Sequence, residues 1–252
     1  ERPGDVYVRC ENLIALRDDG KQAVNKLNLE IRAGEIFGVA GVGGNGQTEL
    51  AEILMGVRKP SSGKIILNSR DITNASPHQR RNLGLVVIAA DRYAHGLAGD
   101  LSIADNFTVV TLQSGSYGNA FWIDRNAMAR STLDAINSFE IHGAKPTGKV
   151  RLLSGGNAQK LVLARELSVE HKTLVMAHLP TRGLDVRAYA AVHQHLCDAR
   201  DSGAAVLLIS EDLDEILGLS NRVGVLNRGH IVGVFDSPVD RQKVGELMVG
   251  HA

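Results

Sequence analysis

The chain has 252 residues, of which 44% are hydrophobic and 4% aromatic, enough apolar material for one large domain or two lobes. Its formal net charge is zero and it has no basic tract, so the sequence shows no cluster of positive charge typical of nucleic-acid binding. The apolar runs are far too short to span a bilayer, and no signal peptide is visible.

The first predicted elements form a small β layer. Apolar and polar side chains alternate over residues 6–14 and again over residues 27–31, which predicts two half-buried strands. Residues 17–21 between them are typical of a turn. The uninterrupted apolar run of residues 36–40 then predicts a buried strand.

A glycine-rich loop follows that buried strand. Residues 41–48 read Gly-Val-Gly-Gly-Asn-Gly-Gln-Thr, and residues 49–55 continue as a helix that Gly56 is expected to cap. Glycines let backbone N–H groups close around phosphate oxygens, and the helix adds its positive N-terminal end. The order of strand, loop and helix therefore predicts a phosphate-binding loop, with a tight turn that holds no ligand as the alternative.

The loop departs from the phosphate-loop template Gly-x4-Gly-Lys-Ser/Thr at one position. Gly41, Gly46 and Thr48 match the template, but Gln47 stands in place of the lysine. An amide can donate a hydrogen bond to phosphate, but it lacks the positive charge that reaches the β- and γ-phosphates. That attraction is worth roughly 4 kcal/mol gross near a protein surface, so its loss should weaken binding.

The middle of the chain alternates short elements with loops. Residues 64–67 predict a short strand, and Ser76 and Pro77 should begin a short helix as its N-cap and first residue. Residues 83–90 predict a buried strand, whereas residues 91–118 are rich in loops.

The second half predicts a mostly parallel core with a mainly helical insert. Helices are predicted over residues 125–139, 155–169 and 187–200 and from residue 241, buried strands over residues 173–177 and 204–210, and a hairpin over residues 223–226 and 231–235. The insert covers about residues 106–170.

A second motif ends the insert. Residues 153–160 read Leu-Ser-Gly-Gly-Asn-Ala-Gln-Lys and lead into a predicted helix. A hydroxyl and free N–H groups at a helix N-terminus can hold an anion, although the same residues also suit a plain helix cap. The motif is followed by the buried strand of residues 173–177 and by Pro-Thr-Arg-Gly-Leu-Asp at residues 180–185.

These motifs, in this order, make the chain similar to the nucleotide-binding domain of ABC transporters over essentially its whole length. Residues 153–157 resemble the signature motif, and residues 180–185 resemble the end of the Walker B motif and the D-loop. The resemblance implies an α/β fold with a P-loop NTPase (RecA-like) core and an N-terminal antiparallel β layer, over residues 1–105 and 171–252, with a helical insert at about 106–170.

A narrower resemblance concerns the C-terminal half of tandem ATPases that drive bacterial uptake of simple sugars and nucleosides. It is carried by residues 44–49, Asp91 and Arg92, Asn157 in place of the usual glutamine, and residues 180–186. It implies a single domain, residues 1–252, from a two-domain ATPase, and the start at Glu1 agrees with a fragment. The partners implied are an N-terminal ATPase domain, transmembrane permease subunits and, indirectly, a solute-binding protein, at the cytoplasmic face of the membrane.

In the family, two such domains meet head to tail and enclose each ATP between one domain's Walker motifs and the other's signature. The resemblance assigns the chain's own ATP and Mg²⁺ site, with Thr48 at the metal, to Gly41, Gly43, Gly44, Asn45, Gly46, Gln47, Thr48 and Glu49. It assigns contacts with the partner's ATP to Leu153, Ser154, Gly155, Gly156 and Asn157. Asp185 would lie at the dimer seam.

The departures from the family indicate that the chain's own site is degenerate. The Walker B strand should end in Asp-Glu, but His178 and Leu179 stand there. A neutral imidazole is a poor substitute for a carboxylate on Mg²⁺, and a leucine cannot act as the base. Glu211 replaces the expected switch histidine, and Ala90 stands near the place of the expected glutamine after the strand of residues 83–90.

Three hypotheses fit these residues. The first is a catalytically degenerate domain of an importer whose signature completes a partner's ATP site. The second is an ATPase that is competent by itself through an unusual base, Glu211 or His178. The third is an ABC ATPase without a membrane partner. Cys10 and Cys197 match no metal spacing and favour a reducing compartment.

Two features have simpler structural interpretations. His178 on an apolar strand is more often a core histidine than a metal ligand. Asp212, Asp214 and Glu215 are expected to form a solvated helix start that suits the helix dipole.

Overall fold

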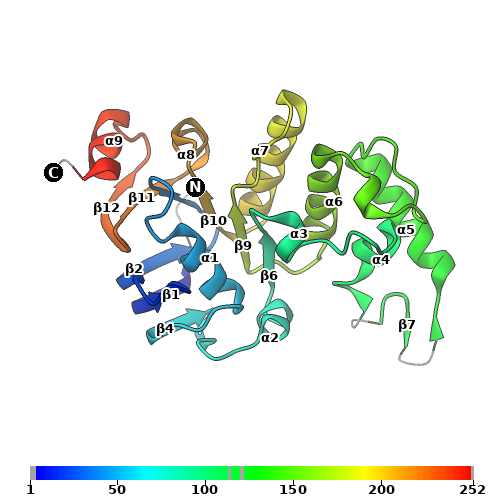
Figure 1. The fold of residues 1–252 in the computed structure, drawn as a ribbon, viewed down its shortest axis with the longest axis horizontal. Helices are drawn as coiled ribbons and strands as arrows, with labels where there is room; N and C mark the ends of the chain where they lie inside the picture. Colours follow the sequence, from blue (N-terminus) through cyan, green and yellow to red (C-terminus); the bar gives the residue numbers. More distant parts are fainter. Residues whose placement is uncertain (1–3, 113–114, 120–121, 251–252) are drawn as a thin grey trace. The chain divides into compact units, whose positions relative to one another are not determined.

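The computed structural model describes residues 4–112, 115–119 and 122–250 (Figure 1). The chain packs as two compact units, each with its own apolar core. The first comprises residues 1–87, 171–180 and 193–252, and the second comprises residues 88–170 and 181–192.

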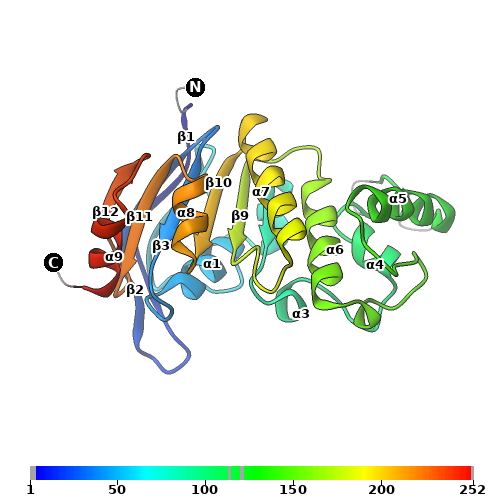
Figure 2. The same ribbon diagram turned by 90° about the horizontal axis from the view of Figure 1, so that it is seen from above.

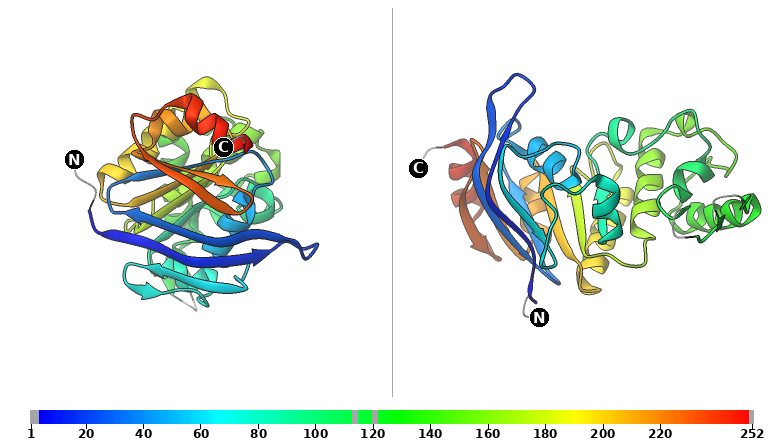
Figure 3. Two further views of the ribbon diagram at one scale, coloured as in Figure 1. Left: turned by 90° about the vertical axis from the view of Figure 1, so that its left-hand side faces the viewer. Right: turned by 90° about the horizontal axis from the view of Figure 1, so that it is seen from below.

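The first unit contains a four-stranded antiparallel sheet in the order β2-β1-β4-β5. Its strands are β1 Val6–Leu16, β2 Gln22–Arg32, β4 Ser62–Leu67 and β5 Arg70–Asp71. Strands β1 and β2 confirm the two alternating patterns, and β4 confirms the predicted short strand; all three extend somewhat beyond the predicted bounds. The long β1 and β2 run side by side in the left view of Figure 3. The predicted β layer is therefore present.

The second sheet of this unit has six strands in the order β12-β11-β3-β10-β9-β6 (Figure 2). They are β3 Ile36–Ala40, β6 Leu85–Ile88, β9 Leu174–His178, β10 Ala205–Ser210, β11 Arg222–Asn227 and β12 His230–Asp236. Strand β3 is parallel to β10 and β11, β10 is parallel to β9, and β12 returns antiparallel to β11. Strands β3, β6, β9 and β10 are buried along their whole length, which explains their continuous apolar sequences.

The register of the parallel strands gathers several chain segments at one edge of the sheet. Ala40 at the end of β3 pairs with Ser210 at the end of β10, and Ile209 pairs with His178 at the end of β9. The residues that follow these strands therefore emerge together at the carboxyl edge, where open α/β sheets bind their ligands.

Among the described residues, four helices lie wholly within the first unit: α1 Gln47–Met55, α2 Pro77–Asn82, α8 Leu213–Leu219 and α9 Arg241–Val249. Two predicted caps are confirmed. Gly56 ends α1 with φ 84°, and the Ser76 hydroxyl accepts a hydrogen bond from the backbone of Gln79 at the start of α2. Asp212 is the N-cap of α8, which agrees with the predicted helix start.

The prediction that Glu215 is solvated was wrong. This side chain is only 1% exposed, and its Oε1 lies 3.1 Å from Nε2 of His193. Helix α8 packs on β3 and β10, so the face that carries Glu215 and Ile216 turns inward. The acidic pattern at a helix start could not show which of its members lies on the packed face.

The second unit is mainly helical, with α3 Arg92–His95, α4 Ile103–Thr108, α5 Arg125–Ser138 and α6 Gly155–Leu167 and a short pairing of β7 Gly118–Asn119 with β8 Trp122–Ile123. Helix α7 Val186–Asp201 follows later in the chain. Buried side chains of α4, α5 and α6 form one core cluster that includes Ile103, Phe107, Ile136, Leu161 and Val162. Within the described ranges, no helix has both the length and the apolar character needed to cross a membrane.

Candidate functional site

The glycine-rich loop lies where the sequence predicted it, between β3 and α1. Gly46, the N-cap of α1, adopts φ 111°, a conformation that favours glycine. A Cβ atom at this position would lie 2.3 Å from the backbone oxygen of Ala23. The loop therefore needs glycine at residue 46 both for its turn and for its close approach to β2.

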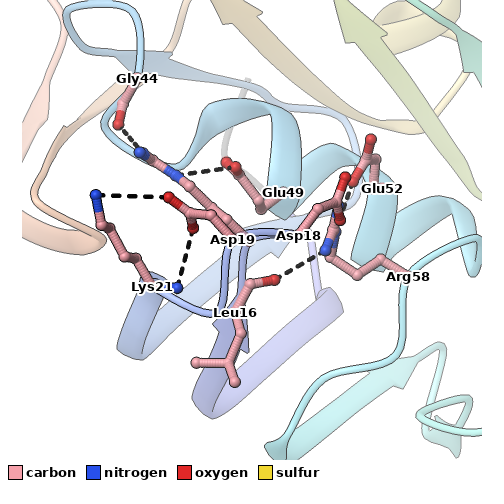
Figure 4. A network of polar contacts seen from close by, with 9 residues as sticks. Leu16, Asp18, Asp19, Lys21, Gly44, Glu49, Glu52 and Arg58 are labelled. Carbon is pink, nitrogen blue, oxygen red and sulfur yellow. Dashed lines mark hydrogen bonds and ion pairs between the residues drawn. The ribbon is translucent and has the colours of Figure 1, made fainter.

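Neighbouring turns hold the outer side of the loop. The Arg17 guanidinium donates a hydrogen bond to the backbone oxygen of Gly44, and its Nε lies 3.2 Å from Oε1 of Glu49 (Figure 4). The backbone N–H of Arg228 donates to Oδ1 of Asn45 at 3.1 Å. No local sequence pattern relates Arg17 to this loop, which begins more than twenty positions later, so its contact could not be predicted.

Gln47 is folded back onto the loop rather than extended away from it. Its side chain is 5% exposed, and Nε2 donates to the backbone oxygen of Val42 at 2.9 Å. Its buried Oε1 has no hydrogen-bond partner among the described protein groups. Thr48 is exposed in the first turn of α1. The amide that replaces the expected lysine therefore bonds to a neutral carbonyl of the same loop.

Glu211 directly follows β10 and reaches the loop. Its Oε1 would lie 2.7 Å from a Cβ atom built on Gly43, which places a carboxylate in contact with the loop backbone. The residue is exposed to solvent. A carboxylate thus stands at a loop whose backbone geometry is typical of a site for anions.

No carboxylate stands at the end of β9. His178 is 7% exposed, and burial lowers the pKa of its imidazole to about 4, against a smaller opposing effect of Glu52. The ring is therefore neutral at neutral pH. The next residue, Leu179, has φ 48°, and its backbone N–H donates to Ile209 at 2.8 Å.

This set of residues does not fit a magnesium-bound triphosphate. Thr48 offers one hydroxyl oxygen, but the hard cation prefers carboxylates, and His178 and Leu179 offer none. Across the residues that the structure describes, no group of three or more His, Cys, Asp or Glu side chains could hold a metal ion. Ala90, which follows β6, has only a methyl side chain.

The second motif forms the start of α6. Ser154 is the N-cap, and its Oγ accepts hydrogen bonds from the backbone N and from Nδ2 of Asn157, at 3.4 and 3.1 Å. The Asn157 side chain also accepts a bond from the backbone N of His142 at 3.1 Å. Leu153 packs against the core cluster of the second unit, whereas Ser154 and Gly155 are exposed. The hydroxyl and the helix start are thus presented to solvent.

A cation lies beside this helix start. Nη2 of Arg92 would be 3.3 Å from a Cβ atom at Gly155, and its Nη1 donates to Oε1 of Gln159 at 3.3 Å. The preceding Asp91 instead caps α3 through the backbone N–H groups of Tyr93 and Ala94, and these bonds lower the pKa of its carboxyl. The guanidinium adds positive charge to the positive end of α6.

Asp185 lies at the start of α7 and is exposed. Its Oδ1 accepts a hydrogen bond from the backbone N–H of Ala188 at 2.9 Å. This bond lowers the pKa of the Asp185 carboxyl, with smaller contributions from Arg187 and Lys160. The residue therefore carries a negative charge at neutral pH and fixes the start of the helix.

Comparisons with known proteins give one consistent family. Residues 24–177 match the family model described as "ABC transporter". The chain is 38% identical to the glucose import ATP-binding protein TsgD13 of Haloferax volcanii, over 98% of this chain and 46% of that protein. It is also 38% identical to the nucleoside import ATP-binding protein NupA of Lactococcus lactis subsp. cremoris, over 99% of this chain and 49% of that protein.

A solved structure supports the same fold. The ATP-binding subunit of an ABC transporter superimposes with a TM-score of 0.78 at 16% sequence identity, covering 96% of this chain and 99% of that one. At this identity the likeness concerns the fold alone. The chain spans about half the length of the two curated relatives named above.

Proposed function

The chain belongs to the ABC transporter family, and from this premise we propose that it is a nucleotide-binding domain of an importer for nucleosides or simple sugars. In this proposal its own phosphate loop is degenerate, and the start of α6 completes the ATP site of a partner domain. The curated relatives are named as import ATP-binding proteins for glucose and for nucleosides.

The observation that carries the proposal is the contrast between the two motifs. At the loop, Gln47 is turned onto Val42, and β9 ends in a neutral histidine and a leucine. At α6, an exposed Ser154 hydroxyl, free helix N–H groups and the Arg92 guanidinium offer hydrogen bonds and positive charge to a phosphate group. One motif has lost the groups that the chemistry requires, and the other has retained them.

The residues of this chain would then act on a nucleotide held by another domain. Bound ATP supplies the free energy of its hydrolysis. Ser154 and the N–H groups of Gly155 and Gly156 would orient and stabilise its terminal phosphate, and Asn157 holds the Ser154 side chain in place. The charged Asp185 would lie at the seam between the two domains.

The proposed partners follow from the family and from the length of the relatives. Those relatives are about twice as long as this chain, which leaves room for a second ATPase domain of similar size. An importer also requires transmembrane permease subunits and a solute-binding protein. We therefore place the domain at the cytoplasmic face of the membrane, with ATP and Mg²⁺ bound mainly through the partner's residues.

One observation favours a second function, in which the chain hydrolyses ATP by itself. The Glu211 carboxylate lies against the loop and could act as an unusual base. His178 is a weaker candidate, because it is buried and its pKa is lowered to about 4. Steady turnover by the purified chain that is lost in Glu211→Gln would support this alternative.

The test of the leading proposal is the replacement Ser154→Ala in the assembled transporter. Loss of an N-cap costs about 1 kcal/mol, so the domain should still fold. Ser102→Ala is the matched control, because Ser102 caps α4 in the same unit and its Oγ accepts the Asp105 backbone N–H at 3.0 Å. We expect ATP turnover to fall at least about tenfold in Ser154→Ala only, in line with the loss of a transition-state hydrogen bond.

A third variant separates the two motifs. Gln47→Ala should change turnover much less than Ser154→Ala, because Gln47 belongs to the degenerate loop. If Ser154→Ala and Ser102→Ala have equally small effects on turnover, the proposed role of α6 is wrong.

A further inference from the structure

We propose that Glu211 determines which nucleotides the phosphate loop accepts, by placing a carboxylate beside the loop, where it repels a nucleoside triphosphate more than a diphosphate. The loop would then bind a nucleoside diphosphate at least as well as a triphosphate. This inference deepens the proposed function and rests on it for the chemical class of the ligand.

The sheet topology brings Glu211 to the loop. Strands β3 and β10 are parallel neighbours, with Ala40 paired to Ser210, so residues 41 and 211 both leave the sheet at its carboxyl edge. From there Oε1 of Glu211 comes within 2.7 Å of a Cβ position at Gly43. The contact thus follows from strand register and does not depend on the end of a long flexible loop.

The position of Gly43 places the Glu211 carboxylate beside the phosphate-binding backbone. In phosphate loops the backbone N–H groups of the glycine-rich loop cradle the α- and β-phosphates, and the missing lysine would reach the β- and γ-phosphates. Gly43 belongs to this loop and precedes the helix start at Gln47. The Glu211 carboxylate therefore adds negative charge next to the phosphate groups that the loop would hold.

Other contacts hold the loop in place. Arg17 bonds to the oxygen of Gly44, and Gly46 lies against the backbone of Ala23. The loop is therefore anchored on the protein beside the Glu211 carboxylate.

The charges near the loop strengthen the effect. Gln47 provides no positive charge to offset Glu211, and the nearby guanidinium of Arg17 is paired with Glu49. A triphosphate carries more negative charge than a diphosphate, and like charges at contact distance repel. Because Glu211 is exposed, salt should screen this repulsion.

The experiment is calorimetric titration of the full 252-residue chain with MgATP and with MgADP, at low and at high salt. For the wild type we expect MgATP to bind no more tightly than MgADP. Glu211→Gln keeps the shape of the side chain and removes its charge. This variant should bind MgATP at least about tenfold more tightly and change MgADP affinity by less than about threefold. The gain for MgATP should shrink at high salt.

Asp212→Asn is the matched control. It removes the same charge one residue away, and asparagine caps α8 as well as aspartate does. We expect this variant to leave the ratio of MgATP to MgADP affinity unchanged. An equal gain in both variants would mean that net charge, and not the position of Glu211, sets the affinity.

Three results would overturn the inference: wild-type chain that binds MgATP well above MgADP, Glu211→Gln that tightens both nucleotides equally, or Glu211→Gln without measurable MgATP binding at millimolar nucleotide. None of these results depends on Ser154. If Ser154→Ala leaves transporter turnover unchanged, the proposed function is wrong, but the ratio of MgATP to MgADP affinity is unaffected. Failure of the proposed function can therefore be told apart from failure of the Glu211 inference.

Discussion

Arg80 supports the helix that begins at the phosphate loop, and its replacement should strongly destabilise the fold. The side chain is 1% exposed. Its Nη1 donates to the backbone oxygens of Ile53 and Leu54, at 2.6 and 2.8 Å, near the C-terminus of α1. Its Nε and Nη2 donate to the oxygens of Ala75 and Thr73, at 3.0 and 3.2 Å. One guanidinium therefore satisfies carbonyl groups of the helix and of the segment before α2.

The expected loss follows from these bonds. A buried carbonyl group without a hydrogen bond costs about 1–3 kcal/mol of stability. Arg80→Met would remove the donor from several such groups. Two effects reduce the expected loss of stability. The backbone N–H of Gly56 also bonds to Ile53, at 3.1 Å, and burial of the guanidinium is itself unfavourable, which lowers its pKa. We therefore expect a net loss of about 2–4 kcal/mol in the free energy of unfolding, from buried carbonyl groups that lose their donor.

Urea unfolding followed by circular dichroism tests this prediction. Arg70→Met is the matched control, because Arg70 is exposed on the short strand β5 and should change stability by less than about 0.5 kcal/mol. If Arg80→Met loses no more stability than the control, Arg80 does not stabilise the C-terminal end of α1.

Three further predictions concern the loop and its surroundings. Gln47→Lys should tighten MgATP binding by about tenfold in calorimetry without producing turnover, because it restores a charge but no metal carboxylate or base. Gly46→Ala should lower the unfolding free energy by at least about 2 kcal/mol, because of its positive φ and the oxygen of Ala23, whereas Gly218→Ala, where nothing crowds the added methyl group, should not. The pKa of His178 falls from 6.5 to about 4 on folding, so between these pH values the unfolded chain binds a proton at His178 and the folded chain does not. Stability should therefore decline by about 3 kcal/mol as the pH falls from 6.5 to 4, and His178→Gln should remove that part of the slope in urea titrations at several pH values.

Much of the fold could be predicted from local sequence patterns. The apolar run of residues 36–40 gave the bounds of β3 to the residue, and Ser76 with Pro77 located the start of α2. Strand β5 and helix α3 escaped prediction, because elements of two and four residues are too short to show a periodicity. Local sequence patterns predict a helix or strand correctly where its burial and its caps depend on its own residues.

The candidate site was less accessible to sequence reasoning. The replacements at Gln47, His178 and Glu211 could be read from position alone, because they interrupt recognisable motifs. The contact of Arg17 with the loop and the position of Arg92 beside α6 could not, because each joins residues that are far apart in the chain. Tertiary packing determines such contacts, and the periodicity of apolar residues in the sequence does not predict them.

The most direct test of the central claim is a steady-state assay of ATP hydrolysis by the purified chain alone, at saturating MgATP. We expect no turnover above the blank, because β9 ends in His178 and Leu179, which provide neither a metal carboxylate nor a base. Sustained turnover that is abolished by Glu211→Gln would show instead that the loop belongs to a working ATPase.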